Sequence, residues 1–349
     1  MKRILIDGNQ PQFKANLHCH TNYSDGQNSP EEIKDAYMER GYSIVAFTDH
    51  DILYDQSRLT DENFLALNGY EIATETEDFI KIPSHELPDD FEYNSNFYRF
   101  FYQKRAHFNL IAKSPEINVQ ICYNPKQNCC STLKEKDVKS IPPFHQRQHT
   151  TKDFNYVIEQ ANKNGYLVAY NHPKWSLHTI EDYIGLRGIY AVEWLNGACN
   201  SSGYNENTDA YDDFLLTGNR IFTVATDDTH TLDPHRAFQG WTWILADKLD
   251  YPSVISALEK GNFYSSQGPK ILSAWLEDKT LYVETIGGLS LFLIGRTRER
   301  FGIYEFTKKG DITCFCAHLK VFDFSSPFFR FEVVDAQGKK ACSNAVFDF

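Results

Sequence analysis

The chain has 349 residues, of which 42% are hydrophobic and 23% are charged, and this is the composition of an ordinary globular protein. The length suits either two domains or one large domain with an appendage. The formal net charge of −12 argues against a surface that grips long nucleic acid, because such a surface needs an excess of lysine and arginine. Small anionic substrates are not excluded, since bound cations can reverse the local charge.

The start of the chain predicts neither export nor membrane insertion. Its longest apolar run there has three residues and is followed by Asp7, so it is too short for a signal segment. No stretch of the sequence approaches the length of a membrane span. The eight cysteines contain no CxxC pair. We therefore expect a cytoplasmic protein with reduced thiols and no membrane partner, and the oligomeric state stays open.

The first elements in chain order predict a β-α-β unit. A short strand is expected over Lys14–Leu17 and a buried strand over Ile44–Phe47. Between them a helix should begin at Pro30, because Ser29 can serve as N-cap and Glu32 completes a capping box. Two strands joined through a helix would run parallel in one sheet, covered on both faces.

The same alternation of predicted strands and helices continues further along the chain. Apolar runs that stop at polar residues predict strands, and amphipathic periods predict helices. The expected helices cover residues 154–165 and 251–263, and the expected strands begin at residues 166, 189 and 221. In each predicted strand the polar residues stand at the carboxyl end, which is where active sites of α/β barrels lie.

Two regions depart from this rhythm. Residues from about 84 to 150 are rich in polar and loop-forming residues, and we interpret them as an insertion over the mouth of the site. From about residue 270 the helical period disappears, and short alternating runs predict strands with turns between them. We therefore expect a small, sandwich-like β-domain over residues 269–349.

The polar residues at the strand ends form a candidate metal site. His18 and His20 are one residue apart in an extended segment, so they share one face while Cys19 points away. A single catalytic ion takes about three protein ligands plus water. Nine candidate ligands therefore indicate two or three ions bridged by carboxylates, and the nine are His18, His20, Asp25, His50, Glu71, His107, His172, Asp228 and His230.

The motifs that carry these ligands resemble one known family. In this order, HxH, SDG, TDHD, GYE, HFNL, NHP and DDTH are similar to the PHP (polymerase and histidinol phosphatase) superfamily of metal-dependent phosphoesterases. The resemblance covers Asn16 to about His230 in motifs and extends to about Gly268 in layout. It implies a distorted (β/α)7 barrel over residues 10–268.

The resemblance also implies a trinuclear site. One ion would take His18, His20, Glu71 and Asp228. A second would take Glu71 as a bridge together with His107 and His172, and a third would take Asp25, His50 and His230. We expect two to three divalent ions of zinc, manganese or iron.

The implied activity is hydrolysis of a small phosphate ester. A water held between divalent ions becomes hydroxide near neutral pH and attacks phosphorus. We expect Asp25, His50, Asp228 and His230 to take part in catalysis, and Lys174 and Arg236 to bind the substrate phosphate. Asp25 stands where some members have histidine, which resembles the small-nucleotide phosphodiesterase branch. We therefore expect a small, nucleotide-like phosphomonoester or phosphodiester as substrate, and no long nucleic acid as partner.

Alternatives remain at this stage. A phosphatase of the histidinol phosphate type is the nearest alternative enzyme, and a non-catalytic PHP scaffold is the alternative of another class. Glu193 and Asn196 end a strand without being ligands and are interpreted as pocket-lining residues. His178 and His235 are either general acids for the leaving group or loop histidines. Asp227 is expected to make structural hydrogen bonds.

Overall fold

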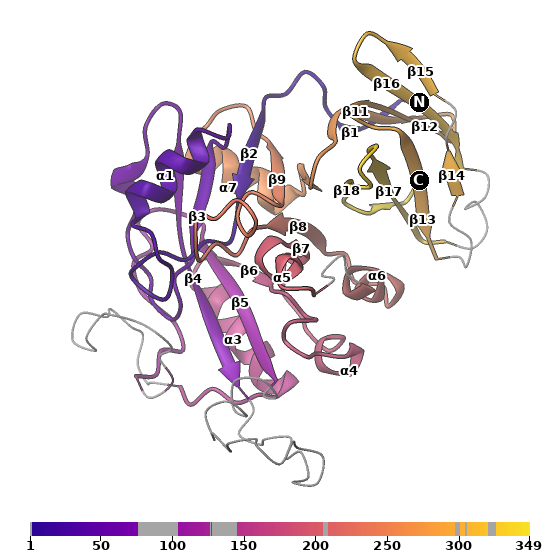
Figure 1. Cartoon of the computed structure of the whole chain (residues 1–349). Coiled ribbons are helices and arrows are strands. Elements are labelled where there is room, and N and C mark those ends of the chain that lie inside the picture. The colour runs from indigo at the N-terminus through magenta and orange to yellow at the C-terminus, as the bar shows by residue number, and fades with distance from the viewer. Residues whose placement is uncertain are drawn as a thin grey trace, which may run out of the picture.

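The computed structural model describes residues 2–75, 104–125, 127, 145–204, 209–296, 301–303, 306–319 and 326–349. The fold is mixed α/β, with one sheet of fourteen strands and a second of five. Figure 1 shows the strands between residues 12 and 245 on one side, and the strands after residue 269 together with the N-terminal strand on the other. Much of the predicted insertion, including residues 84–103 and 128–144, lies outside the described residues.

The predicted β-α-β unit is confirmed. Strand β2 (Gln12–Asn16) pairs in parallel with β3 (Ile44–Phe47), and helix α1 (Pro30–Met38) lies between them in the chain. The Ser29 hydroxyl accepts from the Glu32 backbone N–H, and the Glu32 carboxylate accepts from the Ser29 N–H. This reciprocal cap fixes where the helix begins, as the sequence predicts.

Five further strands extend this sheet in chain order. They are β4 (Leu65–Glu75), β5 (Arg105–Ala112), β6 (Tyr166–Tyr170), β7 (Ala191–Asn196) and β8 (Phe222–Thr226). Strands β2 to β4 are parallel to one another, and so are β6 to β8, whereas β5 is antiparallel to both neighbours. After β8, Thr229 forms a bridge with Cys19, which follows β2. The bridge brings the ends of the first and last of these strands together.

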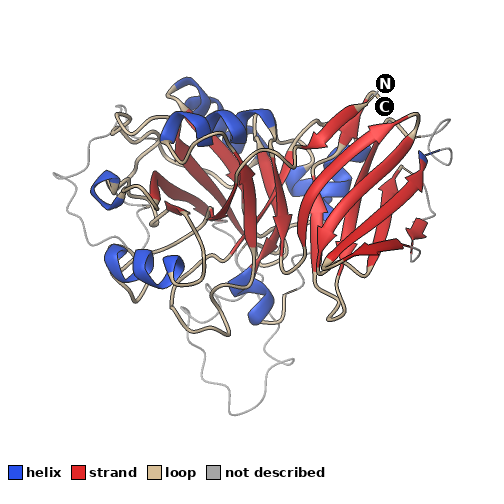
Figure 2. Cartoon of the chain, turned by 90° about the horizontal axis from the view of Figure 1, so that it is seen from above, coloured by secondary structure: helices blue, strands red, loops and turns tan. Residues whose placement is uncertain are grey.

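The helices lie around the outside of these strands (Figure 2). Besides α1 they are α3 (Thr151–Lys163), α4 (Ile180–Tyr183), α5 (Gly197–Ser201), α6 (Asp209–Leu216) and α7 (Tyr251–Lys260). The connection from β3 to β4 carries only a 3-10 turn, Ser57–Leu59. In the described residues a regular alternation of parallel strand and helix is therefore absent, because β5 reverses direction and one connection lacks an α-helix.

One difference concerns the predicted insertion. Residues Arg105–Ala112, inside the range expected to be loop-rich, form β5 in the middle of the sheet. Its run from Ala106 to Ala112 is buried on both faces. A strand buried on both faces reads as a continuous apolar run rather than an alternating one, so it is hard to separate from a buried helix by periodicity.

The late strands form the predicted β-rich region. The five-stranded sheet contains β1 (Arg3–Ile6), β11 (Lys270–Glu277), β12 (Thr280–Ile286), β15 (Phe306–Lys309) and β16 (Ile312–His318). Facing strands continue the large sheet: β9 (Trp241–Leu245), β10 (Phe263–Ser266), β13 (Ser290–Gly295), β14 (Phe301–Ile303), β17 (Phe328–Val334), β18 (Lys340–Ser343) and β19 (Val346–Phe347). The inner faces of both groups share one hydrophobic core that includes Ile271, Leu281, Leu293 and Phe331.

The β-rich region is joined to the rest of the chain at two places. Strand β10 pairs with β9 on one side and with β18 on the other. One sheet therefore contains strands from both sides of the domain boundary predicted at residue 268. The N-terminal strand β1 pairs with β11, and the Arg3 guanidinium donates to the Phe347 carbonyl at 2.9 Å. Both chain ends therefore lie in the β-rich region (Figure 1).

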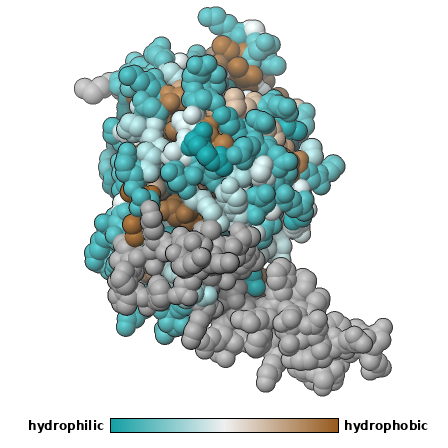
Figure 3. All heavy atoms as spheres, turned by 90° about the vertical axis from the view of Figure 1, so that its left-hand side faces the viewer, coloured by the Kyte–Doolittle hydropathy of each residue, from teal (hydrophilic) through white to brown (hydrophobic). Residues whose placement is uncertain are grey.

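The surface and the cysteines add two observations. The face shown in Figure 3 is mainly hydrophilic, with hydrophobic side chains in small separate groups. Within the described ranges no helix is both long and apolar enough to cross a membrane. Six cysteines there are free thiols, and the predicted cytoplasmic location stays a prediction.

Candidate metal centre

The opening histidines lie at the end of β2 and point to the same side. The Nε2 atoms of His18 and His20 are 3.1 Å apart, and both residues are fully buried. Cys19 points the other way, into a core with Ile33 and Phe47. The one-residue spacing in an extended segment thus has the predicted geometry.

Glu71, on β4, is the central carboxylate of the site. It is 1% exposed, and its oxygens accept a hydrogen bond from Asn171 at 2.7 Å. The same two oxygens lie 3.1–3.5 Å from ring nitrogens of five histidines: His18, His20, His50, His107 and His172. A carboxylate in this position can bridge two ions.

Asp228 closes the site on the side of β8. Its Oδ1 atom is 3.2 Å from His18 Nε2 and 3.1 Å from His20 Nε2. The same oxygen lies 3.5 Å from His230 Nδ1. Asp228 therefore connects the His18 end of the site to the His230 end.

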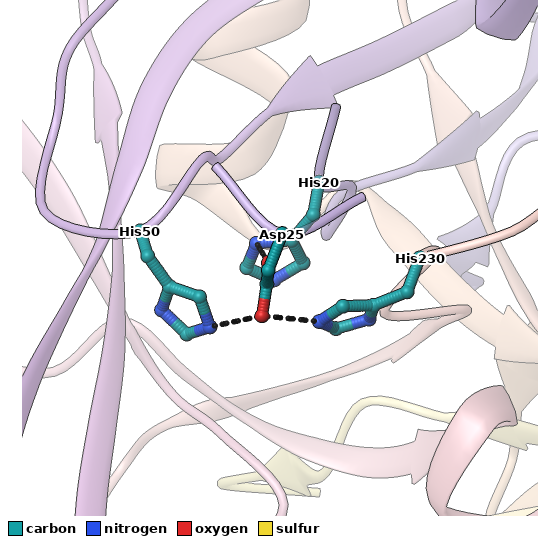
Figure 4. Close-up of side chains that lie close together, drawn as sticks. All are labelled: His20, Asp25, His50 and His230. Atoms are coloured by element: carbon teal, nitrogen blue, oxygen red, sulfur yellow. Dashed lines mark ion pairs between the residues drawn. The ribbon is translucent and has the colours of Figure 1, made fainter. Parts of the chain in front are cut away.

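Asp25 stands between three histidine rings, as Figure 4 shows. Its carboxylate lies 3.6 Å from His20, 3.5 Å from His50 and 3.4 Å from His230. The side chains of Asp25 and His230 are 31% and 33% exposed, whereas the other seven candidate ligands are buried. This group is therefore the open edge of the site, where a substrate can approach.

The loop that carries Asp25 is held in place by hydrogen bonds that its residues donate to Asp49. Asp49 accepts from the Thr21 backbone N–H at 2.8 Å and from the Ser24 hydroxyl at 2.7 Å. A Cβ at Gly26 would come within 2.5 Å of the His20 carbonyl oxygen, so only glycine fits there. These contacts explain the SDG motif by the close turn it makes, and they give Asp49 a structural role.

Several buried nitrogen and oxygen atoms of the site lack a hydrogen-bond partner. His20 Nδ1, His50 Nδ1, His107 Nδ1 and Asp228 Oδ1 are buried atoms without a hydrogen-bond partner among the described residues. Buried polar atoms normally have partners, so four such atoms in one place need a common explanation. Three overlapping groups have ligand atoms within 4.8 Å of one another: His20, Asp25, His50 and His230; His18, His20 and Glu71; and His50, Glu71 and His107. Imidazole nitrogen and carboxylate oxygen together suit divalent transition metals, so these residues fit bound ions.

The electrostatics of the groups agree with this interpretation. Burial alone would raise the pKa of Glu71, but the surrounding histidines hold the pKa well below its ordinary value. Burial lowers the pKa of His107 to about 4, so this imidazole is neutral and has a lone pair for an ion. At the open edge Asp228 and Asp25 outweigh burial and raise the pKa of His230 to about 9. Metal binding at that edge would therefore displace a proton from His230.

Glu193, on β7, has a role that the sequence did not reveal. It is fully buried, and its Oε1 atom lies 2.6 Å from His18 Nδ1. A carboxylate beside one ring nitrogen of a histidine fixes the tautomer and directs the other nitrogen to a metal. The sequence placed Glu193 only as a pocket-lining residue, because its partner comes from a strand 175 positions away.

Asn196 and Asp227 are also explained. The Asn196 amide donates to Glu193 at 3.0 Å and to Asp228 at 3.1 Å. Asp227 accepts from the Tyr37 hydroxyl at 2.8 Å and from the backbone N–H groups of residues 238–240. These hydrogen bonds are of the structural kind expected for Asp227.

Other predicted residues lie outside the ligand cluster. Lys174 and Arg236 are both exposed, and their predicted contact with a substrate phosphate stays a prediction. His178 accepts from the Tyr170 hydroxyl at 2.5 Å and has its other nitrogen 3.2 Å from His149, so both nitrogens are engaged. That arrangement argues against His178 as the general acid. His235 is exposed.

Arg147 is a residue whose place only the structure reveals. It is 4% exposed and forms a buried ion pair with Asp51, the residue after His50. The Asp51 carbonyl accepts from Gln120 at 2.7 Å, and Gln127 accepts from the Arg147 backbone N–H at 2.7 Å. The segment beginning at residue 145 is thereby fastened to the loop that carries His50.

Comparisons with known proteins show what the chain is similar to. Residues 16–82 match the family model of the PHP domain, and this range includes five of the nine candidate ligands. No curated protein matches the chain. A two-domain protein from Bacteroides vulgatus, described as containing a predicted PHP-like metal-dependent phosphoesterase, is similar over 95% of this chain and 92% of its own, at 15% identity and a TM-score of 0.43.

Two solved structures of endonuclease Q are also similar. The enzyme from Pyrococcus furiosus, described as a lesion-specific endonuclease, is similar over 72% of this chain and 56% of its own, at 13% identity and a TM-score of 0.40. Endonuclease Q in complex with a 27-mer duplex containing an abasic lesion is similar over 72% of this chain and 57% of its own, at 12% identity and a TM-score of 0.37.

The duplex complex contradicts the sequence-based expectation of no long nucleic acid, and that prediction was wrong. It rested on net charge, which sums the whole surface and says little about the field at one edge of a site that holds cations. The motif order and the match over residues 16–82 agree: this part of the chain, with five of the nine candidate ligands, is similar to the PHP domain.

Proposed function

We propose that the protein is a metal-dependent phosphoesterase that uses this centre to hydrolyse a phosphate ester. The observation that carries the proposal is the set of buried, unpartnered nitrogen and oxygen atoms around Glu71 and Asp228. Bound divalent ions would supply Lewis acidity at the phosphoryl oxygens and a water of lowered pKa as nucleophile.

The chain's own residues have distinct parts in this proposal. The nine candidate ligands, His18, His20, Asp25, His50, Glu71, His107, His172, Asp228 and His230, would hold two to three ions of zinc, manganese or iron. Asp25, His50, Asp228 and His230 would line the place where the phosphate arrives, because Asp25 and His230 form the exposed edge. Lys174 and Arg236 are the candidate phosphate contacts beyond that edge.

Aromatic rings beside the site support a nucleotide-like substrate, free or within a nucleic acid. The Trp175 ring is half-buried and packs against His107 and His172, with ring centroids 5.3 and 4.7 Å apart. At the Asp25 side, Tyr23 and Tyr54 pack with ring centroids 4.3 Å apart. Aromatic faces accept any nucleobase, so such rings suit a base attached to the reacting phosphate.

We also propose the division of the chain that the sequence suggested. Seven strands, β2 to β8, would form a distorted barrel within residues 10–268, supported by the Cys19–Thr229 bridge that links its first and last strands. Residues 269–349 would form a β-domain that β1 joins from the N-terminus. All nine candidate ligands precede this β-domain.

The test combines metal analysis with a panel of phosphate esters. Purified protein should contain at least two divalent ions per chain and hydrolyse an aryl phosphate, mononucleotide esters or DNA, whereas His50→Ala should be inactive in the same assay. Long single-stranded and duplex DNA belong in the panel beside the small esters, at matched low salt. A protein that loads with metal and hydrolyses none of these esters would favour the scaffold role, and activity confined to histidinol phosphate would favour the alternative phosphatase.

A further inference from the structure

The buried carboxylate of Glu193 touches three of the candidate ligands, directly or through one amide. Its Oε1 atom lies 2.6 Å from His18 Nδ1, and its Oε2 atom accepts the His172 backbone N–H at 2.9 Å. Oε2 also accepts from Asn196 Nδ2 at 3.0 Å, and that amide donates to Asp228 at 3.1 Å. His18, His172 and Asp228 come from three different strand ends, so Glu193 links them in space.

Two of these ligands have a backbone conformation that needs support. His172 has a φ of 26° and Asp228 a φ of 52°. Residues other than glycine rarely adopt positive φ angles. Such backbone conformations are strained and persist only where the surrounding structure holds them. The contacts of Glu193 and Asn196 reach both residues, and they hold the backbone at His172 and the side chain at Asp228.

The hydrogen bonds around Glu193 require a carboxylate. All four partners present donors, namely His18 Nδ1–H, the Thr226 hydroxyl at 2.7 Å, the His172 N–H and the Asn196 amide. An ionised carboxylate accepts at both oxygens, whereas a glutamine amide would turn its NH2 group against two of these donors. With a proton on Nδ1 for the contact with Glu193, the lone pair of a neutral His18 ring lies on Nε2.

That lone pair points at other electron-rich atoms. His18 Nε2 lies 3.1 Å from His20 Nε2, 3.2 Å from Asp228 Oδ1 and 3.3 Å from Glu71 Oε1. Four ligand atoms facing one another at these distances are stabilised by a cation between them.

We propose that Glu193 positions the ligands of one ion. Its negative charge would set the affinity for the ion that His18, His20, Glu71 and Asp228 hold. The inference rests on the proposed metal-dependent function and assigns a further residue to it. Glu193 acts on the ion through His18, His172 and Asp228 and is not itself a ligand. A buried carboxylate behind a ligating histidine raises the basicity of the imidazole and holds the ring in place.

The test measures metal affinity and needs no substrate. Zn²⁺ binding is measured by competition with a chromophoric chelator for the wild type, Glu193→Gln and a matched control, Glu332→Gln. Glu332 is also a buried glutamate, 3% exposed, but its partners are Arg330 and Lys340 in the β-rich region. We expect Glu193→Gln to weaken the tightest Zn²⁺ site by roughly 10–100-fold, and Glu332→Gln to leave it unchanged.

A milder variant covers the case in which Glu193→Gln does not fold. Thr226→Val keeps the shape of the side chain and removes one of the four donors to Glu193, so Zn²⁺ affinity should fall by a smaller factor. Wild-type affinity in folded Glu193→Gln, or in Thr226→Val where Glu193→Gln does not fold, would overturn the inference and leave the proposed function intact. A wild-type protein that binds none of Zn²⁺, Mn²⁺ and Fe²⁺ would instead overturn the proposed function and the inference with it.

Discussion

Two buried clusters of charged residues lie in this molecule, and they are built in opposite ways. In the Arg330 cluster, which consists of Arg330, Asp212, Glu332 and Lys340, the guanidinium donates to Asp212 at 2.7 and 3.0 Å and to Glu332 at 2.7 Å. Lys340 lies 3.0 Å from the second oxygen of Glu332. Two positive and two negative charges balance, and they join α6 to β17 and β18.

The metal cluster, meaning the nine candidate ligands, has no such balance of positive and negative charges. In the part of the chain that the structure describes, the ion-pair partners of Glu71 and Asp228 are all histidines. Several of its buried atoms lack a hydrogen-bond partner. The comparison teaches how to separate two kinds of buried charge: a cluster whose donors and acceptors match one another is structural, and a cluster of unmatched acceptors is shaped for a cation.

The largest expected effect comes from breaking the balanced cluster. Arg330→Met would leave the Asp212 and Glu332 carboxylates without their guanidinium, and we expect a loss of about 3–5 kcal/mol in the free energy of unfolding. Urea denaturation followed by circular dichroism measures this loss. As a control, Arg220→Met removes an exposed ion pair with Asp348 and should change the free energy of unfolding by about 0–1 kcal/mol. Equal stability of the two variants would contradict the structural role of the Arg330 cluster.

The next effect comes from the metal cluster. Asp228→Asn keeps the shape of the side chain and removes one of the charges that face His18 and His20. The rate of phosphate ester hydrolysis should fall by at least about a hundredfold, which corresponds to about 2.7 kcal/mol in the activation free energy. Initial rates on an aryl phosphate measure this, with Glu332→Gln as the control that should keep near wild-type activity. A metal-replete Asp228→Asn protein of normal rate would exclude Asp228 from catalysis.

Removing metal should lower the Tm through the metal cluster and leave the contribution of the Arg330 cluster to the Tm unchanged. A ligand present at ten times its Kd stabilises the folded state by about 1.4 kcal/mol, so treatment with a chelator should lower the Tm of the wild type and readdition of metal should restore it. Calorimetry of wild type, Arg330→Met and Asp228→Asn makes the comparison. The chelator should act equally on the first two and less on Asp228→Asn, and a chelator-insensitive wild type would contradict a bound ion.

The smallest expected effect is a pH dependence within the Arg330 cluster. Burial alone would raise the pKa of Glu332, but Arg330 and Lys340 outweigh it and hold the pKa below the ordinary value of 4.5. Because the folded state has the lower pKa, the stability from this group is present above pH 4.5 and is lost as the pH falls through the folded-state value. Between pH 6 and pH 3.5 the Tm of the wild type should therefore fall more steeply than that of Glu332→Gln. Parallel Tm profiles would contradict this contribution.

Much of the candidate site could be predicted from the chain because the ligands occur in short local motifs. Alternation in an extended segment places His18 and His20 on one side, and the capping residues of α1 fix the β-α-β unit that carries them. The direction of strand ends then brings His50 and Glu71 to the same edge. Local stereochemistry suffices for His18, His20 and the start of α1, whereas the meeting of His50 and Glu71 also needs the parallel pairing of β3 with β4.

Other conclusions needed partners far apart in the chain. The strand β5 was placed within an insertion because a buried strand lacks alternation, and the strand β1 pairs with β11, about 270 residues away. Arg147 takes its place from a buried ion pair with Asp51, which lies 96 positions earlier in the chain.

The sequence by itself thus determined the kind of chemistry, a cluster of imidazoles and carboxylates at strand ends, because residue type and local spacing set which atoms can face a metal. Only the tertiary structure decided which second layer of residues holds those ligands in place. Glu193 is the clearest example, since nothing around it in the chain marks it out from any other strand glutamate. Its hydrogen bonds to His18, His172, Asn196 and Thr226 exist only when several strands meet, and a buried carboxylate takes its role from the donors that surround it.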